Sequence, residues 1–246
     1  MILIKNEKEL KIMREGGKIL ASIMEEVKKN VSPGITTDKL NQVAEGLVFK
    51  FGKPSFKGYN NFPATLCTSI NEEIVHGVPS SRKLKEGDII SLDLGLFYKG
   101  YHTDMAVTVP VGNVSPEFLR LIMVSKKALK RGLKKAKEGS TFGDIGNTIE
   151  RYVNSQGLDI VNNLCGHGIG KDLHEEPEIP NYGKRNTGSK IQKGMVFCIE
   201  PMISMFGSEI KLAEDGYAYK TTNNSISAHY EHTVAITDKG AEIITN

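Results

Sequence analysis

The chain repeats part of its own sequence after about 105 residues, and this repeat restricts the folds that it can adopt. Two segments open in the same way, Pro33-Gly34-Ile35-Thr36 and Glu138-Gly139-Ser140-Thr141, and each precedes an amphipathic helical pattern that ends at a glycine. The matched pairs keep their order along both helices: Gly34 and Gly139, Thr36 and Thr141, Leu40 and Ile145, Glu45 and Glu150, Val48 and Val153, Gly52 and Gly157. The repeat predicts two related halves.

A second match extends the repeat into strand-forming sequence. The segment 84–93 resembles 191–200, so that Asp93 falls on Glu200, and Asp104 aligns with Glu231 through 103–107 and 230–234. Chance similarity between two helix–helix–strand units is the alternative, but order and chemistry agree throughout both halves, which favours duplication. Each half is therefore expected to supply one acidic residue from each of two strands.

Hydrophobic periodicity predicts an α+β fold. Helices are expected over 7–29 and 37–51, from Ser115 onward and over 142–156, and a strand pair surrounds the turn near Tyr98-Lys99-Gly100. Further strands are expected in 158–165, 194–203, 208–221 and 227–237. We predict one domain over 1–246, with half-repeats of about 1–110 and 111–246. The halves should form a curved antiparallel sheet about a pseudo-twofold axis, with helices covering one face.

Composition excludes several other classes of protein. A net charge of +3 is too small to argue for a nucleic-acid or membrane partner, and the basic cluster at 126–137 is expected to be a solvated helix face. Three cysteines without CxxC spacing argue against a disulfide framework and a structural zinc site. The sequence has no signal-peptide pattern near its start and no apolar run of membrane-spanning length. The cytoplasm is therefore the expected location.

Four acidic residues stand in apolar, strand-forming surroundings, namely Asp93, Asp104, Glu200 and Glu231. Carboxylates are rarely buried unless they are paired, protonated or bound to a cation. Asp93 and Asp104 are expected to face each other across a hairpin, with Cβ atoms about 4.5–5.5 Å apart unless a bulge shifts the register. With His167 in Gly166-His167-Gly168-Ile169-Gly170, the four acids predict an oxygen-rich site for Mn, Fe(II), Co or Zn.

Two further histidines lie among turn residues, where loops at the mouth of a site are expected. They are His76 in Asn71-Glu72-Glu73-Ile74-Val75-His76-Gly77-Val78-Pro79 and His174 in Leu173-His174-Glu175-Glu176-Pro177. Either one taken alone is more often a surface or core histidine than a functional one. The remaining histidines, His102, His229 and His232, are expected to be structural or to support the site.

In combination, these motifs resemble type I methionine aminopeptidases of the bacterial kind, over nearly the whole chain. The residues that carry the resemblance are the His76 and His174 motifs, Asp93 with Asp104, Gly166-His167-Gly168-Ile169-Gly170, Ile199-Glu200-Pro201 and Glu231-His232-Thr233. The resemblance implies the pita-bread fold and two divalent metal ions, drawn from Co, Mn, Fe(II), Zn and Ni. It implies five ligands: Asp93, Asp104, His167, Glu200 and Glu231.

The resemblance also implies the reaction. A hydroxide that bridges the metals would attack the first peptide bond of a nascent protein and remove the initiator methionine when the second residue is small. Glu200 would act as general base, His174 would donate a hydrogen bond to the developing oxyanion, and His76 would contact the scissile amide nitrogen. One metal would hold the free α-amino group.

The family's methionine pocket corresponds to residues of both halves, with Phe56 nearby: Tyr59, Phe62, Cys67, Leu173 and Tyr217. Cys67 is expected to line this pocket and not to act as a nucleophile, because no triad pattern accompanies it. Family members often carry larger aromatic residues at the positions of Leu173 and Tyr217, and this chain has no tryptophan. The pocket should therefore be apolar, with a shape of its own.

Two other functions remain open at this point. Proline-specific peptidases share the fold and the ligands, but they usually carry a large N-terminal domain for which this chain has no room. A catalytically silent module that binds a partner such as the ribosome would tend to lose metal ligands, and all five are present. The expected partners are N-termini of nascent polypeptides, with transient ribosome association, no membrane, no specific nucleic acid and a monomeric enzyme.

Overall fold

The four predicted helices form at their expected places in the computed structural model, which describes residues 2–246 and so leaves Met1 of the expected domain outside the described residues. They are α1 (Glu7–Lys29), α2 (Thr37–Val48), α3 (Pro116–Lys135) and α4 (Phe142–Ser155). At the start of α1, the Asn6 side chain accepts a hydrogen bond from the Glu9 N–H, and the Glu9 carboxylate accepts one from the Asn6 N–H. This reciprocal cap satisfies two otherwise unpaired donors. Helix α2 ends three residues before the predicted boundary.

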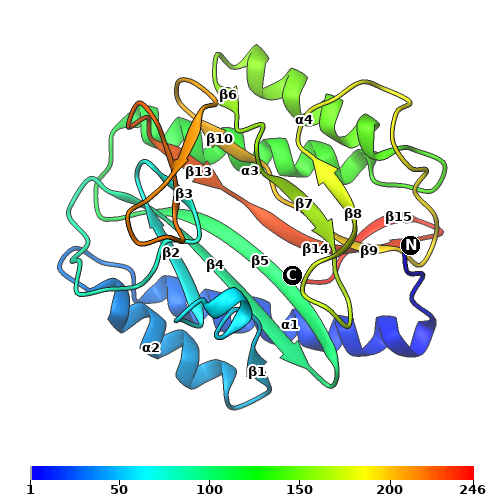
Figure 1. Ribbon diagram of the computed structural model, residues 1–246, viewed down its shortest axis with the longest axis horizontal. Coiled ribbons are helices and arrows are strands. Elements are labelled where there is room, and N and C mark those ends of the chain that lie inside the picture. Colours follow the sequence, from blue (N-terminus) through cyan, green and yellow to red (C-terminus); the bar gives the residue numbers. More distant parts are fainter. Residues whose placement is uncertain (1) are drawn as a thin grey trace.

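The strands form one large and two small antiparallel sheets (Figure 1). The nine-stranded sheet has the order β1 (Lys53–Pro54), β4 (Ile89–Tyr98), β5 (Tyr101–Pro110), β14 (Glu231–Thr237), β9 (Val196–Ile199), β7 (Cys165–Gly168), β8 (Glu175–Pro180). The other two of the nine strands pair outside this order, β2 (Leu66–Ile70) with β4 and β15 (Gly240–Ile243) with β14. The predicted α+β fold with a curved antiparallel sheet is thereby confirmed.

The small sheets explain why the later predicted strands are shorter than expected. One contains β6 (Asp159–Ile160), β10 (Met202–Ser204) and β13 (Ser227–His229), and the other contains β3 (Glu73–Val75), β11 (Ile210–Leu212) and β12 (Tyr219–Thr221). The expected strand 194–203 divides at Glu200-Pro201, and 227–237 divides at Tyr230, where the chain passes from one sheet to another. Proline contributes no N–H to a ladder, so a strand break at Pro201 is physically expected.

The hairpin between β4 and β5 corrects the predicted pairing of Asp93 with Asp104. Its two-residue loop is Lys99-Gly100, because Tyr98 pairs with Tyr101, and both loop residues have positive φ, 48° and 92°. Positive φ at both central positions defines a type I′ turn, for which glycine is well suited. The turn lies one residue further along than expected, so Asp93 is opposite Ala106 and Asp104 is opposite Gly95. The two carboxylates are diagonal neighbours on one face.

The pseudo-twofold relation appears in backbone contacts that recur in both halves. Thr36 forms a bridge with Lys83 just as Thr141 does with Lys190. The Gly34 N–H donates to the Leu84 carbonyl, and the equivalent bond joins the Gly139 N–H to Ile191. In the large sheet, β5 and β14 are adjacent central strands, and β4 and β9 flank them in the same way. The axis thus passes between the strands that carry Asp104 and Glu231.

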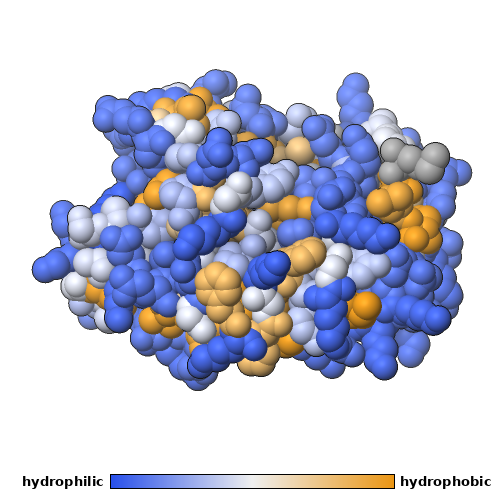
Figure 2. Space-filling model, turned by 60° about the horizontal axis from the view of Figure 1, so that its bottom comes forward, coloured by the Kyte–Doolittle hydropathy of each residue, from blue (hydrophilic) through white to orange (hydrophobic). Residues whose placement is uncertain are grey.

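Each half has its own apolar core between helices and sheet. Leu92 and Leu94 of β4 pack with Leu20 of α1 and Leu40 of α2, whereas Phe197 of β9 packs with residues of α3 and α4. In Figure 1, α1 and α2 (blue) lie below the diagonal central strands, and α3 and α4 (green) lie above them. Because neighbouring strand residues point to opposite faces, Asp93 points away from the helices. Figure 2 shows a largely hydrophilic surface with a few apolar groups near its centre.

Candidate metal centre and substrate cavity

The floor of the site is a row of acidic side chains across the central strands. Ala106 of β5 is opposite both Asp93 of β4 and Glu231 of β14, and Asp104 lies two residues along β5 on the same face. Glu200 follows β9 directly. The exposed fractions are 8% for Asp93, 4% for Asp104, 8% for Glu200 and 2% for Glu231. Strand register therefore brings four carboxylates together where water hardly reaches them.

The floor acids are strongly perturbed as long as no cation compensates them. Burial raises the pKa of Asp93, Asp104, Glu200 and Glu231, and repulsion from neighbouring carboxylates raises it further for Asp93, Glu200 and Glu231. One oxygen each of Asp93, Asp104 and Glu231 is buried without a hydrogen-bond partner among residues 2–246. Carboxylate oxygens of these three residues lie within 4.8 Å of one another. Such orphaned, converging oxygens fit hard or borderline divalent cations.

The His167 imidazole is held in the tautomer that a metal ligand requires. Its Nδ1 lies 2.9 Å from the Gly168 carbonyl oxygen, which can only accept, so Nδ1 carries the proton. Burial lowers the pKa of His167 to about 3, so the ring is neutral and Nε2 keeps its lone pair. That Nε2 lies 3.6 Å from Glu200 Oε1. A backbone hydrogen bond of this kind commonly fixes a ligand histidine.

Two neighbours of the floor were not expected among the site residues. His229 lines the cavity with Nε2 3.5 Å from Glu200 Oε2, and neither ring nitrogen has a hydrogen-bond partner within the described residues. Cys198 lies close to His167 and Glu231, but burial raises the pKa of its thiol, which opposes the thiolate form that binds metals. Both stand two positions before an acidic site residue, and strand alternation is the sequence signal that could have identified them.

Tyr59 and Phe62 project from a loop with an unusual backbone. The intervening Asn60 and Asn61 have φ values of 46° and 62°, in the left-handed region that asparagine tolerates better than most residues. The Phe62 N–H donates to the Tyr59 carbonyl, which closes the turn. These two asparagines therefore aim both rings into the cavity.

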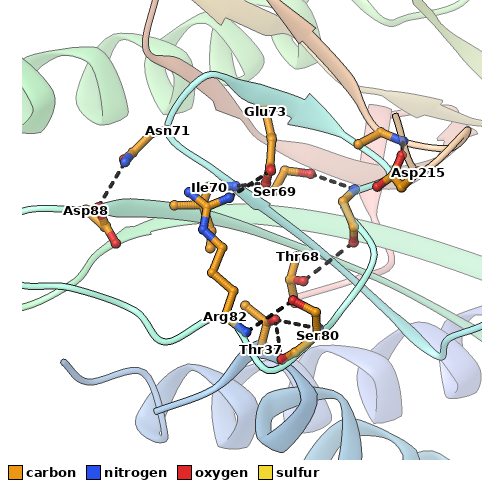
Figure 3. Close-up of polar contacts among 12 residues, drawn as sticks. Thr37, Thr68, Ser69, Ile70, Asn71, Glu73, Ser80, Arg82, Asp88 and Asp215 are labelled. Atoms are coloured by element: carbon orange, nitrogen blue, oxygen red, sulfur yellow. Dashed lines mark hydrogen bonds and ion pairs between the residues drawn. The ribbon is translucent and has the colours of Figure 1, made fainter. Parts of the chain in front are cut away.

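His76 also lies in the left-handed region, with φ of 60°, immediately after β3. The next residue, Gly77, is held by two hydrogen bonds: the Thr68 N–H donates to the Gly77 carbonyl, and the Gly77 N–H donates to Ser69 Oγ. Figure 3 shows the polar contacts that brace this loop, including Asn71 with Asp88 and Arg82 with Glu73. A strained, non-glycine backbone persists only where its surroundings determine it, and such sites are often functional.

His174 stands at the mouth of the cavity between two rings. Its Nδ1 is 2.9 Å from the Tyr59 hydroxyl oxygen, and its ring packs edge-on against Tyr59 and His167. Desolvation by these neighbours lowers the pKa of His174. When the tyrosine hydroxyl donates to Nδ1, the neutral ring carries its proton on Nε2, which can then donate to a substrate.

All twelve predicted site residues line one cavity of about 580 Å³, a volume typical of small-ligand sites. The five predicted ligands form its floor, and His76 and His174 stand at the sides. The predicted pocket residues form an apolar wall, in which the Phe62 and Tyr217 rings pack edge-on at 5.6 Å and the Tyr217 hydroxyl donates to the Asn61 carbonyl. Cys67 and Leu173 are buried in the apolar cluster beside this wall, together with Phe56. Sequence reasoning thus selected residues that the fold brings together.

A comparison with protein families identifies a family whose match includes all of these site residues. A model of metallopeptidase family M24 matches residues 11–238, a range that contains the whole acidic floor and all seven residues of the cavity sides and wall. The chain belongs to metallopeptidase family M24. Membership in M24 implies the use of divalent metal ions, for which the buried floor is suited.

Individual proteins resemble the chain over its full length. Methionine aminopeptidase 1 of Bacillus subtilis (strain 168) is 46% identical to it over 246 residues, which are 100% of this chain and 99% of that relative. The crystal structure of methionine aminopeptidase from Thermotoga maritima has a TM-score of 0.98 at 40% identity, with 100% of each chain covered. The prolidase from Pyrococcus horikoshii OT3 is 23% identical with a TM-score of 0.81, and this chain covers 64% of it, which shows the shared fold alone.

These likenesses confirm the predicted family and the pita-bread fold. Within residues 2–246, none of the helices is long and apolar enough to cross a membrane.

Proposed function

We propose that this M24 protein is an aminopeptidase that removes N-terminal methionine from proteins whose second residue is small. The observation that carries the proposal is the convergence of four buried carboxylates and one neutral imidazole on the floor of a cavity with an apolar wall. Full-length similarity to methionine aminopeptidases supports the choice of substrate. We further propose that residues 1–246 act as one domain whose half-repeats, about 1–110 and 111–246, each contribute to the floor.

We propose two divalent ions in the floor, drawn from Co, Mn, Fe(II), Zn and Ni. Five residues would hold these ions: Asp93 and Asp104 as shared or chelating ligands, Glu231 as a ligand common to both, and His167 and Glu200 as further ligands. The orphaned oxygens of Asp93, Asp104 and Glu231 support this assignment. When bound, such ions supply Lewis acidity and an activated water.

The residues around the floor would then share the proton transfers and the binding of the peptide. Glu200 would accept a proton as general base, since its carboxylate lies on the cavity floor, 3.6 Å from His167 Nε2 and 3.5 Å from His229 Nε2. His174 would donate from Nε2 to the oxygen of the scissile carbonyl, with Tyr59 fixing the tautomer. His76 would hold the amide nitrogen that becomes the leaving amine.

The methionine side chain would lie against the apolar wall formed by Tyr59, Phe62, Cys67, Leu173 and Tyr217. Its thioether is flexible and polarisable, and it packs well on aromatic edges such as those of Phe62 and Tyr217. Burial raises the pKa of the Cys67 thiol, which supports a lining role for Cys67 and no nucleophilic one.

We propose that the enzyme acts as a monomer in the cytoplasm on N-termini of nascent polypeptides, with transient ribosome association. Neither a membrane nor a specific nucleic acid is part of this proposal, because the net charge is only +3. The basic residues of α3 would remain a solvated face.

A peptide assay separates this proposal from the two alternatives. Metal-free protein is incubated with Met-Ala-Ser and Ala-Pro peptides, with and without Mn, Co or Fe(II), and the released amino acids are quantified. Metal-dependent release of methionine is expected. Cleavage only before proline would indicate a proline-specific peptidase, and no hydrolysis with any metal by the folded protein would indicate a binding module.

The two metals should be inequivalent, because His167 has no counterpart in the first half. We propose that the site with His167 and Glu200 binds its ion more tightly. Calorimetric titration of metal into His167→Ala tests this order, and the expected result is a weaker first binding event. First-site affinity equal to that of the wild type would refute it.

A further inference from the structure

A buried ion pair joins the segment before α1 to the loop that carries His174. Lys5 Nζ lies 2.5 Å from Glu175 Oε2, and each side chain is only 5% exposed. The residues are 170 positions apart in the sequence, and Glu175 lines the substrate cavity. Removing both charges from water is unfavourable unless geometry and hydrogen bonds compensate, so a buried pair is weak evidence for stability alone. A role in the site is the more economical explanation.

The surrounding backbone is built to accommodate this pair. The Lys5 N–H donates to the Gly194 carbonyl at 2.8 Å, which fixes the lysine backbone on the turn before β9. At Gly170, a Cβ atom would lie 2.5 Å from Glu175 Oε1 and 2.6 Å from Lys5 Cε, so only glycine leaves room for both side chains. The lysine stem therefore passes between the sheet and the loop 169–175.

The Glu175 carboxylate connects the lysine with the loop itself. Its Oε2 accepts from Lys5, and its Oε1 lies 3.4 Å from the Asp172 N–H. Within the loop, the Gly170 N–H donates to the Asp172 carbonyl, and the His102 N–H donates to the Gly170 carbonyl. Leu173 and His174 lie between Asp172 and Glu175, so the carboxylate holds the loop on both sides of them.

We propose that Lys5 is a positioning residue that acts through Glu175 to hold His174 in place for the reaction. The inference rests on the proposed function, since it concerns the histidine that would donate to the scissile carbonyl. Without the ammonium group, Glu175 would be a buried, unpaired carboxylate and would move toward water. The His174 ring would then shift relative to His167, and a displacement of about 1 Å can reduce a rate a hundredfold.

The test combines kinetics with hydrogen exchange on the metal-loaded full-length protein. Lys5→Met keeps the apolar stem and removes the charge, so kcat for Met-Ala-Ser should fall about tenfold or more. The same substitution in a His174→Ala background should reduce kcat less than about twofold, because the group that Lys5 positions is already absent. Amide exchange in 169–176 should increase in Lys5→Met, and it should stay unchanged in the control Lys193→Met, which breaks the exposed ion pair with Asp238.

A general structural role predicts different results. Equal losses of kcat in both backgrounds, or unchanged exchange in 169–176, would overturn the proposal. If Lys5→Met does not fold, the double variant Lys5→Met/Glu175→Gln contains no buried unpaired charge and should fold. Because it also lacks the Lys5–Glu175 bond that holds the loop, its kcat should stay low and its exchange in 169–176 should stay fast. Wild-type values for this double variant would also refute the inference. Failure of the wild type to release methionine would refute the proposed function instead, and the exchange comparison would still decide whether Lys5 holds the loop.

Discussion

The floor and the rim of the cavity are built in opposite ways. The floor side chains, from Asp93 to Glu231, come from or directly follow paired strands of the central sheet and are almost fully buried. The rim side chains Tyr59, His76 and His174 come from loops and are largely exposed to the cavity. The backbone of the floor is regular and its like charges are crowded, whereas the rim has left-handed backbone at His76 and beside Tyr59 and carries neutral side chains. The two regions should therefore respond differently to substitution.

The difference follows from what each region has to do. A metal site needs several ligands at fixed spacing, and a strand ladder sets such spacing without further support. The cost is electrostatic, because the sheet brings like charges together before any cation binds. A rim that admits a peptide needs open space on the cavity side. Hydrogen bonds to neighbouring loops therefore hold its side chains from the side that faces away from the cavity.

Glu200→Gln should have the largest effect on activity and a small effect on the fold. The variant keeps the shape of the side chain but loses a ligand charge and the general base, so kcat should fall by about 10³-fold or more. The metal-free form should unfold at a slightly higher temperature, because one of four crowded acids becomes neutral. Steady-state release of methionine and a thermal melt measure both effects. Near-normal turnover would show that Glu200 is not the general base.

The crowded floor should also make the metal-free protein sensitive to pH. The pKa of Asp104 is raised to about 7, so the folded chain holds this proton more tightly than the unfolded chain, where Asp titrates near 4. The stabilising contribution is complete below about pH 4 and is lost as pH rises through the folded value. Over this window one such group lowers the free energy of unfolding by about 1.4 kcal/mol per pH unit.

Urea unfolding between pH 5 and 8 with a chelator checks this slope, and Asp104→Asn is the matched variant. The slope should be shallower in Asp104→Asn, and added Mn should restore stability to the wild type at pH 8, because the ion binds the folded chain only. Identical slopes for the two proteins would contradict a raised pKa of Asp104 in the metal-free protein.

The same contrast explains which parts of the site could be predicted from sequence. The acids of the floor stand in strand-type segments that recur in both halves, so alternation and the repeat were sufficient to group Asp93 with Glu200 and Asp104 with Glu231. The finer pairing of Asp93 with Asp104 was wrong by two residues, because it depended on the φ values of Lys99 and Gly100. A turn type that places the loop one residue later shifts the facing pair by two.

The rim could not be derived from local patterns in the same way. The position of Tyr59 depends on left-handed Asn60 and Asn61, and that of His174 depends on contacts with residues more than a hundred positions away. Turn residues indicated only that His76 and His174 lie in loops near the mouth of a site, whereas Tyr59 and the roles of both histidines came from the resemblance to a family. The division of 194–203 and 227–237 into two strands each was missed for a related reason, since a change of sheet is a tertiary event.

Tyr59→Phe should affect the rim moderately. The substitution removes the hydroxyl that lies 2.9 Å from His174 Nδ1, so the imidazole loses the partner that selects its tautomer. We expect kcat to fall about three- to tenfold, in line with one lost hydrogen bond of about 1 kcal/mol, while KM changes little because the ring remains. Tyr182→Phe, an exposed tyrosine outside the cavity lining, is the control and should match the wild type. An unchanged kcat in Tyr59→Phe would show that the floor alone sets the rate.

Cys67→Ala should have the smallest effect, and it separates position in the site from participation in the chemistry. Cys67 pairs with Asp93 across β2 and β4 and lines the cavity, yet burial and the floor acids raise the pKa of its thiol, so a thiolate is strongly disfavoured. Loss of the sulfur should enlarge the methionine pocket slightly and weaken the packing of the substrate side chain. KM for Met-Ala-Ser should therefore rise about two- to fivefold, while kcat stays within about twofold of the wild type. A loss of kcat comparable to that of Glu200→Gln would instead identify Cys67 as a nucleophile. It would contradict the assignment of the chemistry to the floor and of side-chain binding to the wall.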